Sequence, residues 1–197
     1  MYKLNFLPFV GSEYSTGGIF GKRVMVLGES HYGKNPTLDF TRNVVREYLD
    51  PESEYEEWMN TYLKFERSLV NRYTTKKESE TIWQSLLFYN YLQVLMDGPR
   101  ISGTSQQYKD SARAFFEVLD RYNPELIIVW GARLWENLPW ERWTEGDSLI
   151  IDNYEVDNGT YSLPNLCEAT VVKVYHPSGG YSWSWWHKVV KYFLEMS

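Results

Sequence analysis

The 197-residue sequence is 43% hydrophobic and 17% aromatic, a composition that excludes an intrinsically disordered chain and can fill one complete core. We therefore expect a single domain over residues 1–197. The formal net charge of −6 disfavours nucleic-acid binding by the protein as a whole, but the charge is uneven: residues 1–46 carry +3, 47–170 carry −11 and 171–197 carry +2. The two terminal segments are thus the ones suited to contact phosphate groups.

The cysteine and hydropathy content is typical of a cytoplasmic protein. Cys167 is the single cysteine, which excludes an internal disulfide and a cysteine-ligated iron-sulfur cluster. The first residues lack the basic and apolar segments of a signal peptide, and no run approaches the about 18 apolar residues of a membrane span. We expect a cytoplasmic protein that does not enter a membrane.

The first half of the sequence predicts one strand and a helical region. Residues 23–28 form a short apolar run that ends at a glycine, as expected for a buried strand and a tight turn. Two amphipathic helices are predicted over residues 37–73, separated at Pro51. A further helix begins near Glu80, and periodicity leaves open whether residues 86–92 end that helix or form a strand.

The second half alternates helices and strands. In chain order we expect a helix at 105–122, a strand at 126–131, a helix at 132–138, a strand at 170–175 and a helix at 183–196. Residues 139–170 are rich in turn formers and suggest a hairpin or another excursion. Such alternation predicts an α/β fold whose mostly parallel sheet is covered on both faces.

Unusual polar residues follow three of these strands. The segment Gly28–Gly33 supplies a carboxylate, an imidazole and a phenol; Asn90 follows the possible second strand, and His176-Pro177-Ser178 follows the last one. Ligands of parallel α/β sheets bind beyond the carboxyl ends of the strands. We therefore expect Glu29, Asn90 and His176 to line one pocket.

Four segments carry motifs in an order that is more specific than any one of them alone. They are Gly28-Glu29-Ser30-His31-Tyr32-Gly33, Phe88-Tyr89-Asn90, residues 124–131 and Val174-Tyr175-His176-Pro177-Ser178. Together they resemble the uracil-DNA glycosylase superfamily, as a divergent member without an iron-sulfur cluster. The resemblance spans about residues 23–196, with residues 37–78 as a helical insertion. It implies a three-layer α/β/α sandwich around a central, mostly parallel four-stranded sheet.

The resemblance also implies roles for these residues. A glycosylase flips the altered nucleotide out of the strand and reads its base with an amide, here Asn90. His176 would donate a hydrogen bond to the departing base, and Glu29 would orient water toward the sugar. The other residues implied are Ser30, His31 and Tyr32 for base binding, and Ser178, Gly179, Tyr181 and Trp183 for wedging into DNA or contacting its backbone.

The expected function is thus hydrolysis of the N-glycosidic bond of uracil or a related base in single- or double-stranded DNA, with no cofactor. Two alternatives stay open: a non-catalytic module that binds nucleic acid or a nucleobase, and a hydrolase of free nucleosides or nucleotides. Glu29 would otherwise be a turn residue and His176 a helix cap. A metal site is not expected, because His31, His176 and His187 lack the spacing of metal ligands.

Overall fold

The structure is a computed structural model that describes residues 4–34 and 36–196. Its strands are β1 (Phe9–Val10), β2 (Val24–Gly28), β3 (His31–Tyr32), β4 (Leu86–Asn90), β5 (Leu95–Met96), β6 (Leu126–Trp130), β7 (Trp143–Glu145), β8 (Ile150–Ile151), β9 (Tyr154–Glu155), β10 (Asn158–Ser162) and β11 (Glu168–Val174). The helices are α1 (Phe40–Leu49), α2 (Met59–Val70), α3 (Lys76–Gln84), α4 (Ser105–Tyr122), α5 (Ala132–Trp135) and α6 (Trp183–Glu195), with short 3₁₀ turns η1 (Tyr14–Thr16), η2 (Gly18–Phe20) and η3 (Pro164–Leu166).

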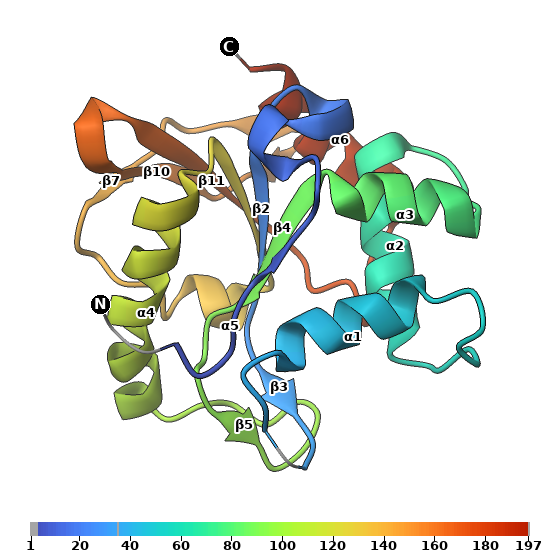
Figure 1. The fold of residues 1–197 in the computed structure, drawn as a ribbon. Helices are drawn as coiled ribbons and strands as arrows, with labels where there is room; N and C mark the ends of the chain where they lie inside the picture. The colour runs from blue at the N-terminus through green and yellow to red at the C-terminus, as the bar shows by residue number, and fades with distance from the viewer. Residues whose placement is uncertain (1–3, 35, 197) are drawn as a thin grey trace.

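One mixed sheet of seven strands organises the fold, in the order β1-β4-β2-β6-β11-β10-β7 (Figure 1). The strands β4, β2, β6 and β11 pair in parallel, which confirms the α/β class and the strands predicted at 23–28, 126–131 and 170–175. The open question at 86–92 is settled as well, because residues 86–90 form β4 beside β2.

The expectation of a four-stranded sheet is wrong. β1 adds an antiparallel strand at one edge, and β10 and β7 add two more at the other. These strands were not predicted from the sequence, because β1 and β7 are very short and β10 begins within the turn-rich segment Asp157-Asn158-Gly159. Gly159 is needed there, since a Cβ atom at this position would lie 2.3 Å from the ring of Trp143 on β7.

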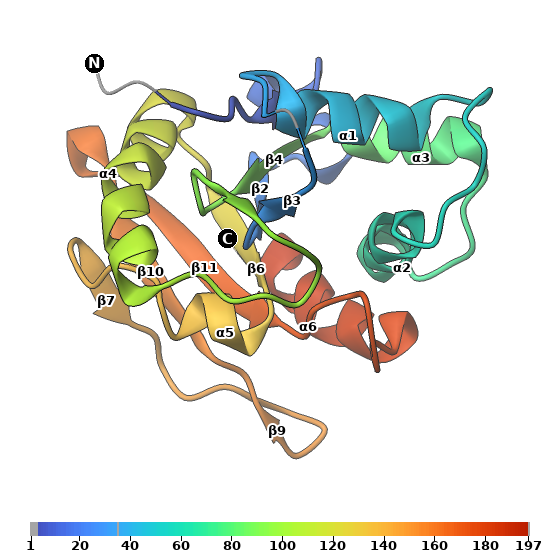
Figure 2. The ribbon, with the colours of Figure 1, turned by 90° about the horizontal axis from the view of Figure 1, so that it is seen from below.

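Helices cover both faces of the sheet, so the protein has three layers (Figure 2). Side chains alternate along β2: Val24 and Val26 join the core beneath α1, α2, α3 and α6, while Met25 and Leu27 join the core beneath α4. Both cores are nearly solvent-free along β2, where all five residues are buried. Two independent apolar layers therefore fix the position of the central strands.

The helical region before β4 contains three helices. The two predicted over 37–73 are confirmed as α1 and α2, and α3 begins at a capping box in which Thr75 and Glu78 bond reciprocally. Their buried side chains, such as Tyr48 and Phe65, belong to the same core as β2 and β4. Residues 37–78 thus pack on the sheet as part of the domain.

The segment 139–170 contains the predicted hairpin. β8 and β9 pair in antiparallel fashion around Asp152 and Asn153, whose φ values are +48° and +64°. Positive φ at both central residues is typical of a tight two-residue hairpin turn. In the described part of the chain, no helix has the length and hydropathy required to cross a bilayer.

Candidate functional site

The loops after β2, β6 and β11 meet at the carboxyl edge of the sheet. These strands are neighbours in the order β2-β6-β11 and run in parallel, so residues that follow them arrive at the same edge. Figure 1 shows β3 and α5 at this edge, and these elements directly follow β2 and β6 in the chain. Gly131 allows the close approach, because a Cβ atom there would lie 3.3 Å from the Cβ atom of His176.

Glu29 is held in an ion pair that joins three elements. Its carboxylate Oε1 accepts hydrogen bonds from Nε of Arg133, at 2.7 Å, and from the hydroxyl of Tyr108; its Oε2 accepts from Nη2 of Arg133. Glu29 is 9% exposed, whereas the side chain of Arg133 is 41% exposed. The hydrogen bond to Glu29 raises the pKa of Arg133, and burial together with that same carboxylate raises the pKa of Tyr108 to about 12. Glu29 is therefore a fixed acceptor held by two donors.

His176 presents a defined donor at the same edge. The backbone N–H of Ser178 donates to its Nδ1 at 3.2 Å, and the Ser178 hydroxyl lies 2.8 Å from the same atom. The neutral ring therefore carries its proton on Nε2. Desolvation by the surrounding protein lowers the pKa of His176, with Glu29 opposing this shift and Arg133 adding to it. His176 is thus a neutral N–H donor. The residue as a whole is exposed to solvent.

No protein-family model matches this sequence, and no curated protein matches it. Among residues 4–34 and 36–196, no three histidine, cysteine, aspartate or glutamate side chains are grouped as metal ligands.

Asn90 and His31 form a buried pair on the α1 side of the sheet. Nδ2 of Asn90 donates to Nδ1 of His31 at 3.1 Å, and Nε2 of His31 lies 2.8 Å from the hydroxyl oxygen of Thr41 on α1. Both residues are 5% exposed. Oδ1 of Asn90 lies beside Gly28, where a Cβ atom would approach it to 2.1 Å. Two of the four predicted base-binding residues are thus brought together, with the ring of His31 held between Asn90 and Thr41.

The burial of His31 predicts a specific acid sensitivity. Desolvation lowers the pKa of His31 to about 3, below its usual value of 6.5 in an unfolded chain. Between these values the unfolded state binds the extra proton, so the contribution of His31 to stability is lost as pH falls from about 6.5 toward 3. We expect His31→Gln to weaken the pH dependence of the unfolding free energy in this window, measured by urea denaturation at several pH values. Parallel curves for wild type and variant would contradict this.

The other predicted site residues differ in exposure. Tyr32 is 47% exposed, so its ring is available for stacking, and Ser178 and Gly179 lie exposed in the loop after β11. Tyr181 is 6% exposed, stacks on Trp186 and donates to the Ser68 hydroxyl. An aromatic ring just before a helix can either project outward or pack in the core. Here the ring of Tyr181 packs in the core between α2 and α6. A wedge or backbone contact by Tyr181 stays a prediction, and it would require the ring to leave these contacts.

Ser30 and Trp183 are both partly buried. The ring of Trp183 packs edge-on against Tyr73, with a centroid separation of 5.6 Å, at the start of α6. This contact supports the ring from the side that faces Tyr73. A wedge at Trp183 stays a prediction.

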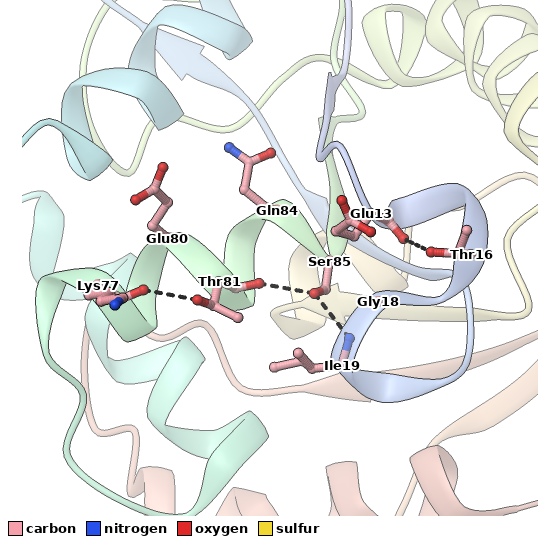
Figure 3. A pocket seen from close by; sticks show the side chains of 9 residues that line it. All are labelled: Glu13, Thr16, Gly18, Ile19, Lys77, Glu80, Thr81, Gln84 and Ser85. Carbon is pink, nitrogen blue, oxygen red and sulfur yellow. Dashed lines mark hydrogen bonds between the residues drawn. The ribbon is translucent and has the colours of Figure 1, made fainter.

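A surface hollow of about 470 Å³ lies at the other end of the sheet (Figure 3). It is lined by Glu13, Thr16, Gly18, Ile19, Lys77, Glu80, Thr81, Gln84 and Ser85. These residues precede β2 or β4, so they lie at the amino ends of the parallel strands. Glu29, Asn90 and His176 follow carboxyl ends and do not line this hollow.

Arg133 and Tyr108 belong to the site but are not among the residues predicted from the sequence. Arg133 lies two residues after Gly131, at the end of a strand that the sequence did predict, so its position at the edge was foreseeable. A carboxylate that becomes buried at a strand end also needs a cationic or hydrogen-bonding partner. The identity of that partner was not foreseeable, because it lies 104 residues further along the chain.

Proposed function

We propose that this protein hydrolyses the N-glycosidic bond of uracil or a related altered base in DNA. The observation that carries the proposal is His176, a neutral imidazole whose Nδ1 accepts from Ser178, which leaves its Nε2–H as a donor at the carboxyl edge of the sheet. Such a donor suits an oxygen that gains negative charge as the glycosidic bond breaks. The order of the motifs, which resembles that of the uracil-DNA glycosylase superfamily, supports the same reaction.

The proposed reaction is a displacement by water. The bond between C1′ of the sugar and the ring nitrogen of the base breaks, and its electron pair leaves with the base. His176 stabilises the negative charge on the base, and Glu29 orients the water molecule that attacks the sugar. Water adds its hydroxyl group to C1′, while its proton passes to the base or to solvent. No cofactor is needed for this balance.

Recognition of the base is assigned to Asn90 and Tyr32. Asn90 commits one Nδ2 proton to His31, and its second Nδ2 proton is assigned to a base edge. Since Asn90 is 5% exposed, the base must enter deeply to reach it. The exposed ring of Tyr32 offers a stacking surface two residues after Ser30.

A second candidate is a non-catalytic module that binds a nucleobase or nucleic acid. It is favoured by the bonding of Glu29, whose two oxygens are both occupied by Arg133 and Tyr108. A carboxylate bound in this way has less capacity to orient water than a free one. The two candidates share the same edge of the sheet and differ in whether any bond is broken.

The deciding experiment uses purified protein and labelled single- and double-stranded oligonucleotides that contain uracil, hypoxanthine or an oxidised base. We expect alkali-labile cleavage at an altered base, and none in matched oligonucleotides with normal bases. Binding without cleavage of any base would support the second candidate and reject the first. A protein that neither binds nor cleaves these oligonucleotides would reject both.

A further inference from the structure

The ion pair at Glu29 leaves little of its carboxylate free. A carboxylate has about four lone-pair positions, two on each oxygen. Oε1 accepts from Tyr108 and from Nε of Arg133, while Oε2 accepts from Nη2 of Arg133. One position on Oε2 is left for a further donor. The arrangement thus selects a single direction in which Glu29 can bind water.

Arg133 also forms a hydrogen bond outside its pair with Glu29. Its Nη1 donates to the backbone carbonyl of Arg100 at 3.2 Å, in the loop between β5 and α4. Arg100 has a φ of +66°, a backbone conformation that L residues seldom adopt. All three nitrogens of the guanidinium are thus engaged, which fixes the plane of its fork and the carboxylate bound to it.

The ion pair of Glu29 and Arg133 also sets the local charge at the carboxyl edge, where a substrate would bind. An unpaired carboxylate at this edge would repel the phosphates of a nucleic acid, and the chain already carries a net charge of −6. Pairing with Arg133 cancels that charge locally while the carboxylate stays an acceptor. Both members act electrostatically on His176, in opposite directions.

We propose that Arg133 is a positioning residue, which acts through Glu29 by fixing the direction of its free lone pair and neutralising its charge at the carboxyl edge. Tyr108 contributes less to positioning Glu29 than Arg133 does, since Tyr108 binds only Oε1 and Arg133 binds both oxygens. This inference rests on the proposed function for its catalytic consequence. The hydrogen bonds of the ion pair do not depend on that function, nor does the approach of Gly131, two residues before Arg133, to His176.

The chain offers a matched control. Arg142 binds Asp120 through both of its terminal nitrogens, and its side chain is 40% exposed, against 41% for Arg133. The charges that act on His176 are those of Glu29 and Arg133. Arg142→Gln therefore removes an equally exposed, paired arginine without removing either of them.

The first measurement is the titration of His176 in the full-length protein, followed by NMR and assigned with a His176→Gln variant. We expect Arg133→Gln to raise the pKa of His176 and Glu29→Gln to lower it, while Arg133→Lys and Arg142→Gln leave it close to wild type. Unchanged titration in both Arg133→Gln and Glu29→Gln would overturn the placement of the pair. Thermal unfolding of each variant verifies that it is folded.

The second measurement is the single-turnover rate on the base that the wild type cleaves. We expect Arg133→Gln to lower the rate on the order of tenfold, Arg133→Lys to restore part of it, and Arg142→Gln to leave it unchanged. Because Arg133 acts through Glu29, the double variant Glu29→Gln/Arg133→Gln should be no slower than Glu29→Gln alone. Additive losses would overturn the inference. If the wild type cleaves no base, the proposed function fails, and the titration by itself supports or overturns the pairing.

Discussion

His176→Ala is expected to lower the single-turnover rate of base release by a factor on the order of 10² to 10³. The neutral ring has its Nδ1 atom bonded to Ser178, so its remaining N–H is oriented before the substrate arrives. A donor aimed at an oxygen that becomes anionic only as the bond breaks stabilises the transition state more than the bound substrate. Affinity for the oligonucleotide should therefore change several-fold at most.

Two measurements separate these contributions: the rate under single-turnover conditions, and the affinity for an oligonucleotide with a normal base in place of the altered one. His187→Ala is the control, because His187 lies on α6 and its Nδ1 lies 2.9 Å from the Ser68 carbonyl oxygen of α2. Equal rates for wild type and His176→Ala would remove His176 from the mechanism. A large loss of affinity with an unchanged rate would assign it to binding.

Glu66→Ala is expected to lower the free energy of unfolding by about 3 to 5 kcal/mol. Glu66 is 0% exposed and accepts hydrogen bonds from Tyr48, Thr74, Ser79 and Trp83, which lie on or next to α1, α2 and α3. Removing the carboxylate leaves several buried donors without an acceptor, and each one costs about 1 to 3 kcal/mol if it stays unpaired. The helices that cover one face of the sheet would lose their shared polar contact.

Urea denaturation measures this loss directly, and Glu80→Ala provides the control. Glu80 is exposed on α3, so its removal should change stability by no more than about 0.5 kcal/mol. Glu66→Gln keeps one acceptor oxygen and should lie between the wild type and Glu66→Ala. A Glu66→Ala variant as stable as Glu80→Ala would show that this network contributes nothing net to the fold.

The central strands were predictable because their sequence signal is local. Residues 23–28 and 126–131 are apolar runs that end at a glycine, and both form parallel strands. A strand buried on both faces needs apolar residues at every position, and this requirement shows in the sequence itself. The carboxyl-edge positions of Glu29 and His176 follow from the same reasoning, since each comes directly after such a strand or within two residues of it.

The edge strands and the bonding partners were decided by the tertiary structure. A strand of two residues, such as β1, has too few positions for a periodicity to appear. Asn90 pairs with His31 across 59 residues, and Glu29 pairs with Arg133 across 104. Tyr181 enters the core because Ser68, 113 residues earlier, offers a partner for its hydroxyl. The sequence by itself determined which residues reach the carboxyl edge, because strand burial is a local property. Only the packed sheet decided which partners meet there, because a buried polar group bonds to whatever group the fold brings within reach.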